Sequence, residues 1–161
     1  MYRLTLLAAT LLAACVAKTP DMPQGAFRPK GGQVYSSAAL DANRLPGRWA
    51  QVATFGPKTC QPGGVDIKPG GKAAYRLCLG GKDIKGAGQL ALTGPGKLSI
   101  AGQDWWVLWV DTDYRTLVIG APAGNFGFIL NRGGAISADR LKAAREILDW
   151  NGYDLSQFTP L

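Results

Sequence analysis

The feature that most constrains the fold is a run of short apolar or alternating segments between residues 48 and 131. Turns containing Gly or Pro separate most of them, and the 161-residue chain holds 22 Gly and 10 Pro. Segments of this length indicate strands, because helices of globular proteins are longer. Eight strands at this spacing predict an all-β sandwich or closed barrel. The expected strands are residues 48–55, 63–67, 73–79, 84–92, 97–101, 105–111, 114–121 and 126–131.

After these strands the apolar period changes to that of a helix, which we expect over residues 137–150. Ser137 is a good N-cap, and Asp139 in the first turn suits the helix dipole. One face of this helix is apolar, and it packs on the barrel or else binds a partner. The apolar stripe consists of Leu141, Ala144, Ile147 and Leu148.

The N-terminus has the pattern of an export signal. Arg3 precedes an apolar stretch, residues 4–14, that is too short to span a bilayer, which needs about 20 apolar residues. The stretch ends in Leu12-Ala13-Ala14-Cys15, which resembles the lipobox of bacterial lipoproteins. We therefore expect residues 1–14 to be a lipoprotein signal peptide and Cys15 to be lipidated. The alternative is an ordinary signal peptide with an incidental cysteine.

The next segment, residues 15–44, contains several Pro and Gly residues and has no periodic apolar pattern. We expect it to be a lipid-anchored flexible tether. The barrel domain is then residues 45–161. The expected location is the bacterial cell envelope, with a lipid anchor in the outer membrane that faces the periplasm.

The chain has three cysteines, so lipidation of Cys15 leaves Cys60 and Cys78 as a pair. An exported protein meets an oxidising periplasm, and we expect these two to form a disulfide. Two free buried thiols are the alternative.

Charge and composition exclude several functional classes. The net charge is +7, but the 18 basic residues are scattered and form no dense run. We therefore expect no nucleic-acid partner, although weak attraction to anionic lipid headgroups stays open. The chain has no histidine, which excludes a Ser–His or Cys–His relay, a His-ligated zinc and a proximal-His haem. We expect that the protein is not an enzyme and that it binds no metal and no cofactor.

Three separated motifs carry a family resemblance. Gly47-Arg48-Trp49 stands at the first expected strand, Thr112-Asp113-Tyr114 lies between the sixth and seventh, and Arg132 follows the eighth. In this order and spacing they resemble the lipocalin family over about residues 45–158. With the lipobox, the chain is similar to bacterial outer-membrane lipoprotein lipocalins. The Gly-rich segment around the second and third strands is shorter than in the family.

The resemblance implies an eight-stranded antiparallel up-and-down β-barrel with one C-terminal α-helix packed outside. In the family the motif Trp closes the narrow end of the barrel and the motif Arg packs across its ring, which here are Trp49 and Arg132. We therefore expect the motif residues to be structural. This set is Gly47, Trp49, Thr112, Asp113, Tyr114 and Arg132.

Strand alternation, matched to the family pattern, predicts the residues that line the barrel interior and contact a ligand. Uncharged aromatic walls suit one hydrophobic or amphipathic molecule, of the fatty acid (such as palmitate) or lysophospholipid type. The expected function is binding and transport or storage of such a ligand. The predicted lining is Phe55, Trp105, Val107, Trp109, Phe126, Phe128 and Leu130.

Two other functions stay open at this point. The rings could fill the barrel, and the protein would then be an envelope interaction or inhibitor protein that acts through loops, such as residues 80–88 with Lys82, Asp83 and Lys85. An enzyme would need an acid–base group inside the barrel. The carboxylates to consider are those of Asp111 and Asp113, near the turn between the sixth and seventh expected strands. The oligomeric state is left open.

Overall fold

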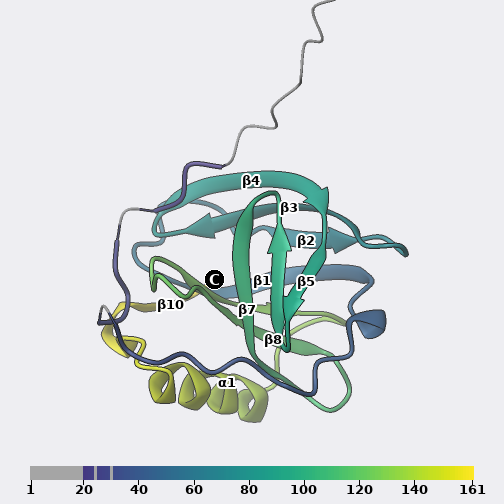
Figure 1. Cartoon of the computed structure of the whole chain (residues 1–161). Helices are drawn as coiled ribbons and strands as arrows, with labels where there is room; N and C mark the ends of the chain where they lie inside the picture. The colour runs from purple at the N-terminus through teal and green to yellow at the C-terminus, as the bar shows by residue number, and fades with distance from the viewer. Residues whose placement is uncertain (1–19, 24, 30) are drawn as a thin grey trace, which may run out of the picture.

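The computed structural model describes residues 20–23, 25–29 and 31–161 (Figure 1). The predicted signal peptide and Cys15 lie outside the described residues. The described chain consists of one antiparallel sheet, one α-helix and two short 3-10 helices. The strands are β1 (Gly47–Phe55), β2 (Gly64–Ile67), β3 (Lys72–Leu79), β4 (Lys82–Gln89), β5 (Ala91–Gly94), β6 (Lys97–Ile100), β7 (Gln103–Val110), β8 (Thr116–Gly120), β9 (Gly127–Asn131) and β10 (Phe158–Pro160). The helices are η1 (Ala42–Arg44), α1 (Ala138–Trp150) and η2 (Leu155–Gln157).

The sheet curls strongly, as Figure 1 shows. Its strand order is β4-β3-β2-β1-β9-β8-β7-β6-β5, and β10 pairs with β1 off this path. The two ends of the path, β4 and β5, are consecutive in the chain and separated by Leu90. The curled sheet therefore has its two end strands joined through one residue.

The expected count of eight strands is not exact. The segment predicted as one strand, residues 84–92, is divided at Leu90, whose backbone N–H donates to the Gly71 carbonyl at 2.8 Å instead of continuing a strand ladder. The C-terminal tail adds β10, which pairs with β1 from Ala53 to Phe55. The mainly antiparallel β architecture with one C-terminal helix is as predicted.

Two hydrophobic clusters lie on opposite faces of the sheet. The inner cluster fills the inside of the curl and draws side chains from β1, β2, β3, β4, β6, β7, β8 and β9. The outer cluster lies between the outside of the sheet and α1, where Ala144 and Leu148 are fully buried. The helix thus packs on its own sheet, as its apolar stripe predicted. No helix within the described ranges combines the length and the apolar character needed to cross a bilayer.

Two β-bulges decide which side chains face inward. The register of β1 shifts between Gln51 and Ala53, and that of β7 shifts between Val107 and Trp109. A bulge inserts one extra residue, which reverses the alternation of every side chain that follows. Phe55 and Trp109 consequently belong to the outer cluster, although simple alternation placed both inside.

The segment expected to be a tether lies against the domain over much of its described part. Phe27 and Arg28 are buried. The Phe27 N–H donates to the Gly124 carbonyl at 2.7 Å, and its own carbonyl accepts from Asp154 N at 2.8 Å. The Arg28 side chain donates from Nε to the Asn151 carbonyl at 3.1 Å. The ring of Phe27 and the guanidinium of Arg28 thus hold the described part of this segment on the domain. The segment has no periodic apolar pattern from which this packing could have been predicted.

One end of the curled sheet is closed by Trp49 and Arg132. The guanidinium carbon of Arg132 lies 3.6 Å from the centroid of the Trp49 ring, a close cation–π contact. Arg132 also donates from Nη2 to the Leu45 carbonyl at 3.1 Å, and Trp49 Nε1 donates to the same carbonyl at 2.9 Å. Gly47 has φ +130°, and a Cβ there would lie 3.5 Å from Arg132 Nη1. These contacts join the start of β1 to the end of β9.

Replacing Arg132 by Met keeps most of the side-chain volume but removes the cation and its donors. We expect Arg132→Met to lower the free energy of unfolding by about 2 kcal/mol, because it removes a cation–π contact and charge-assisted hydrogen bonds. Urea denaturation measures this change. The matched control is Arg48→Met on the exposed face of β1, with an expected change within about 0.5 kcal/mol. Equal effects of the two substitutions would contradict the role assigned to Arg132.

Candidate functional site

The candidate site is the inside of the curled sheet. Of the residues predicted to line it, the inner cluster contains Trp105, Val107, Phe126, Phe128 and Leu130. Phe55 and Trp109 pack instead in the outer cluster, for the reason given above. Whether any of these residues contacts a ligand stays a prediction.

The structure adds residues of β3 that were not predicted. Tyr75 and Leu77 belong to the inner cluster and are 6% and 0% exposed. The signal was present in the sequence, because residues 73, 75, 77 and 79 alternate with more polar or small ones. Strand alternation on β3 would therefore have found Tyr75.

Four aromatic rings form a continuous row inside the sheet. The ring centroids of Tyr75 and Trp105 are 4.9 Å apart, those of Trp105 and Phe128 are 5.2 Å apart, and those of Phe128 and Phe126 are 5.9 Å apart. Trp105 and Phe128 are 2% and 0% exposed. Side chains that lined a void of water size would be more exposed than this, so the rings pack against their neighbours in this state.

The interior also holds polar atoms without partners. Within the described residues, the buried side-chain polar atoms that lack a hydrogen bond are Tyr75 Oη, Trp105 Nε1 and Arg132 Nε. Burial raises the pKa of the Tyr75 phenol, so its hydroxyl keeps its proton at neutral pH. A buried polar group without a partner costs about 1–3 kcal/mol. Two such groups belong to Tyr75 and Trp105, whose rings are neighbours at one end of the aromatic row.

The interior is uncharged. Among the residues that the structure describes, the buried charged side chains are Arg28 and Asp111. Arg28 donates to backbone carbonyls, including those of Gly32 at 2.7 Å and Asn151 at 3.1 Å. Asp111 Oδ1 accepts from the backbone N–H of Thr116 at 2.5 Å. Both charges are therefore engaged outside the inner cluster.

The end of the sheet opposite Trp49 is covered by the N-terminal segment. We call this end the mouth; it is formed by the β1–β2 connection, the β3–β4 and β6–β7 turns, and the β8–β9 connection. Met22 packs against the inner cluster from this side. The Pro20 carbonyl accepts from Gln103 Nε2 at 3.5 Å, and a Cβ on Gly80 would lie 2.9 Å from Pro23 Cβ. Residues 20–23 and 25–28 therefore lie across the mouth, on the left of the view in Figure 1.

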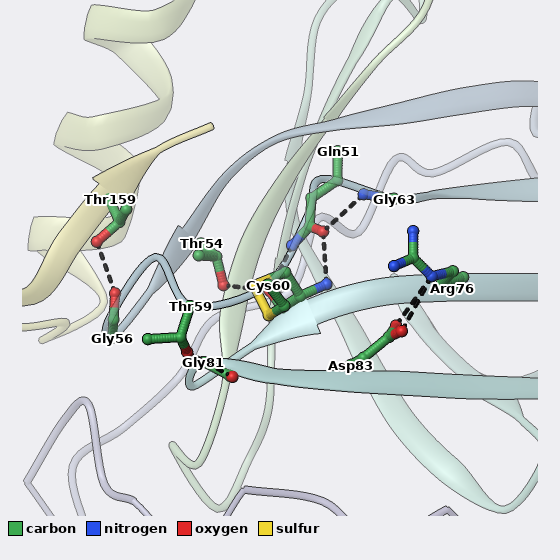
Figure 2. The surroundings of a disulfide bond; sticks show 11 residues. Gln51, Thr54, Gly56, Thr59, Cys60, Gly63, Arg76, Gly81, Asp83 and Thr159 are labelled. Atoms are coloured by element: carbon green, nitrogen blue, oxygen red, sulfur yellow. Dashed lines mark hydrogen bonds and ion pairs between the residues drawn. A yellow bond between two sulfur atoms is a disulfide. The ribbon is translucent and has the colours of Figure 1, made fainter.

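A disulfide stabilises one side of the mouth. Cys60, in the β1–β2 connection, is bonded to Cys78 on β3, with 5.5 Å between the Cα atoms, which confirms the predicted pair. Figure 2 shows the buried side chain of Gln51 beside it, whose Oε1 accepts from Cys78 N at 2.8 Å. The Cys78 carbonyl accepts from Thr54 Oγ1 at 2.8 Å. Polar side chains of β1 thus hold β3 beyond Ala50, where the pairing of β1 with β2 ends.

The β3–β4 segment is not the loop that we offered as an example for the interaction hypothesis. Residues 82–89 form β4, which pairs with β3 along its whole length. The turn between them is short, at Gly80 and Gly81. Asp83 on β4 accepts from Arg76 Nε of β3 at 3.1 Å, as Figure 2 shows. Lys82, Asp83 and Lys85 are therefore strand residues and not part of a projecting loop.

The second motif makes a tight turn at the closed end. Thr112 and Asp113 are exposed, and Asp113 forms an ion pair with Arg115 at 2.8 Å. Tyr114 is buried with φ +56°, and its hydroxyl accepts from the Asp41 N–H at 2.7 Å. The guanidinium of Arg44 in η1 lies 3.9 Å from the Tyr114 ring centroid. The turn therefore holds η1 across the closed end.

Comparison with solved structures shows what this architecture is. Insecticyanin from the tobacco hornworm Manduca sexta aligns over 87% of this chain and 88% of its own, with 16% identity and a TM-score of 0.60. Apocrustacyanin A1 from lobster aligns over 87% and 92%, with 17% identity and a TM-score of 0.55. This chain has the lipocalin fold.

The sequence comparisons support the lipocalin family. The sequence model of the family described as a lipocalin-like domain matches residues 89–161. Temperature-induced lipocalin-1 from Arabidopsis thaliana is 29% identical over an alignment of 147 residues, which covers 73% of this chain and 76% of the plant protein. The part of this chain that the family model matches includes the aromatic strands β7 and β9 and the motif residue Arg132.

Tyr153 fixes the wall of the sheet on the α1 side, and its hydroxyl allows a test of stability against pH. Its hydroxyl accepts from Ala121 N at 3.0 Å and donates to the Phe126 carbonyl at 2.9 Å. Burial raises the pKa of Tyr153 to about 12. Since the unfolded phenol loses its proton near its ordinary pKa of about 10, stability is full below that pH and is lost as the pH rises through the folded pKa.

We therefore expect the free energy of unfolding to fall by about 2–3 kcal/mol between pH 9 and pH 12 because of this one group. Denaturant titrations at several pH values measure the slope. Tyr153→Phe is less stable at pH 9, since it loses both hydrogen bonds, but its alkaline slope is shallower. A variant slope as steep as that of the natural chain would show that Tyr153 does not cause it.

Proposed function

We propose that this protein binds one small hydrophobic or amphipathic molecule inside its curled sheet and catalyses no reaction. Lipocalins typically bind small hydrophobic ligands and are generally non-catalytic. The observation that carries the proposal is the uncharged aromatic interior with two unpartnered donors, at Tyr75 and Trp105. Such an interior suits a ligand that is mostly apolar and has a few polar atoms.

The proposed setting is the bacterial cell envelope, with the chain anchored through a lipidated Cys15. Four residues stand between this position and Pro20, and an extended chain spans at most about 3.5 Å per residue. The mouth would then lie within roughly 20 Å of the membrane surface. This geometry favours a ligand that comes from the membrane, of the fatty acid or lysophospholipid type.

Ligand entry needs a change at the mouth, because the interior is packed in this state. Met22 is the side chain best suited to leave, since it belongs to the N-terminal segment and is only partly buried against the inner cluster. Methionine is flexible and fills irregular gaps, so its loss leaves the rigid strands in place. We propose that an acyl chain takes the place of Met22.

The second candidate is an interaction protein with a permanently filled barrel. The tight packing of Trp105, Phe128 and Leu77 favours it. This candidate predicts that no small molecule enters the sheet.

Native mass spectrometry of residues 16–161, which include every residue that the structure describes, tests the two candidates. After incubation with lysophosphatidylcholine, palmitate and 1-aminoanthracene in turn, we expect a one-to-one adduct and a change in tryptophan fluorescence. Because Met22 covers the mouth, Met22→Ala is expected to speed association several-fold. Leu92→Ala, at an exposed apolar residue, is the control and leaves the rate unchanged. If no probe forms an adduct or changes the fluorescence, the filled-barrel candidate is correct.

A further inference from the structure

We infer that Tyr75 and Trp105 together bind an uncharged carbonyl oxygen, so that the ligand is an acyl ester and not a free fatty acid. This inference rests on the proposed function and names the ligand class for the same interior. It selects between the two lipid types that the aromatic interior alone leaves open.

The rings of Tyr75 and Trp105, each of which carries a hydrogen-bond donor, lie next to each other inside the sheet. Tyr75 on β3 and Trp105 on β7 come from opposite halves of the strand order, and their ring centroids are 4.9 Å apart with an interplanar angle of 57°. Their side chains are 6% and 2% exposed, and neither Tyr75 Oη nor Trp105 Nε1 has a hydrogen-bond partner in the described chain. An indole N–H can only donate, and a neutral phenol can donate too. Two donors in one apolar place suit one acceptor.

Gly86 of β4 leaves space for the Tyr75 hydroxyl. Gly86 is paired with Tyr75 across the β3–β4 ladder. A Cβ on Gly86 would collide with the Tyr75 hydroxyl. The absence of a side chain at residue 86 therefore lets the phenol extend beyond its own strand and lie over β4.

The interior favours a neutral polar group of the ligand over a charged one. A carboxylate inside this interior would lose its hydration without meeting a cation, because the buried Arg28 is engaged with backbone carbonyls at the mouth. Burying an unpaired charge is far more costly than burying a hydrogen-bonded neutral group. An ester carbonyl needs only hydrogen-bond donors. Burial raises the pKa of the Tyr75 phenol still further above neutral pH, so the phenol has its proton to donate. In a lysophospholipid the charged phosphate would stay outside the mouth while the ester lies within.

The fold itself does not need the Tyr75 hydroxyl, which has no hydrogen-bond partner in the described chain. Buried polar groups in native proteins are nearly always hydrogen-bonded, and an exception calls for an explanation. Tyr75→Phe removes a group with no protein partner, so the midpoint of urea denaturation is expected to stay unchanged or to rise. A hydroxyl that served packing or a structural hydrogen bond would give the opposite result.

The test uses two matched probes and residues 16–161. One probe is a lysophosphatidylcholine with a myristoyl ester chain, and the other is its alkyl-ether analogue, which has the same headgroup and chain length but no carbonyl. Titrations followed by tryptophan fluorescence, below the micellar concentration, give the affinities. We expect the ester to bind about a hundredfold more tightly than the ether, about tenfold for each of the two hydrogen bonds. Myristate at pH 8 is expected to bind more weakly than the ester.

Variants assign the difference to the two donors. Tyr75→Phe and Trp105→Phe are each expected to reduce the ratio of ester affinity to ether affinity about tenfold. Tyr35→Phe, at an exposed ring, is the control and changes neither. Equal affinity for ester and ether, or tighter binding of myristate, would overturn the inference while leaving the proposed function in place. Failure of all three probes to bind would overturn the proposed function itself.

Discussion

The contact on which the rest of the structure depends is the guanidinium of Arg132 over the ring of Trp49, at 3.6 Å. It joins the end of β9 to the start of β1, and the hydrogen bonds of both residues to the Leu45 carbonyl hold η1 beside them. Burial lowers the pKa of Arg132 below its ordinary value, yet an arginine stays charged at neutral pH. Closing this end directs access to the interior toward the mouth, where residues 20–23 and 25–28 lie.

Much of the fold could be predicted from local patterns. The alternation of short segments predicted the strands, the 3.6-residue period predicted α1, and the count of cysteines predicted the Cys60–Cys78 bond. These features depend on neighbouring residues or on the parity of a count. The motifs around Trp49 and Arg132 added long-range information that periodicity does not contain.

The candidate site was predicted less completely, for reasons that are also physical. Phe55 and Trp109 face outward because a single extra residue in β1 and in β7 reverses the alternation, and neither bulge has a Gly or Pro to mark it. Tyr75 was missed although β3 alternates clearly. The docking of Phe27 on the β8–β9 connection is a contact between distant residues, which no local pattern predicts.

The interior combines tight apolar packing with two donors that have no protein partner, at Tyr75 and Trp105. A sequence selected for stability alone would avoid this combination, since Phe at residue 75 would fill the same space without an unpaired hydroxyl. Places where a fold breaks a local rule are often functional. This conflict is the reason to assign a ligand to an interior that is packed in its absence.

A crystal structure of residues 16–161 with a bound lysophosphatidylcholine ester tests this account most directly. The account predicts acyl-chain density inside the curled sheet, Met22 displaced from the mouth, and the ester carbonyl within hydrogen-bond distance of Tyr75 Oη or Trp105 Nε1. Density confined to the outer surface, with Met22 and the row of rings unmoved, would contradict it.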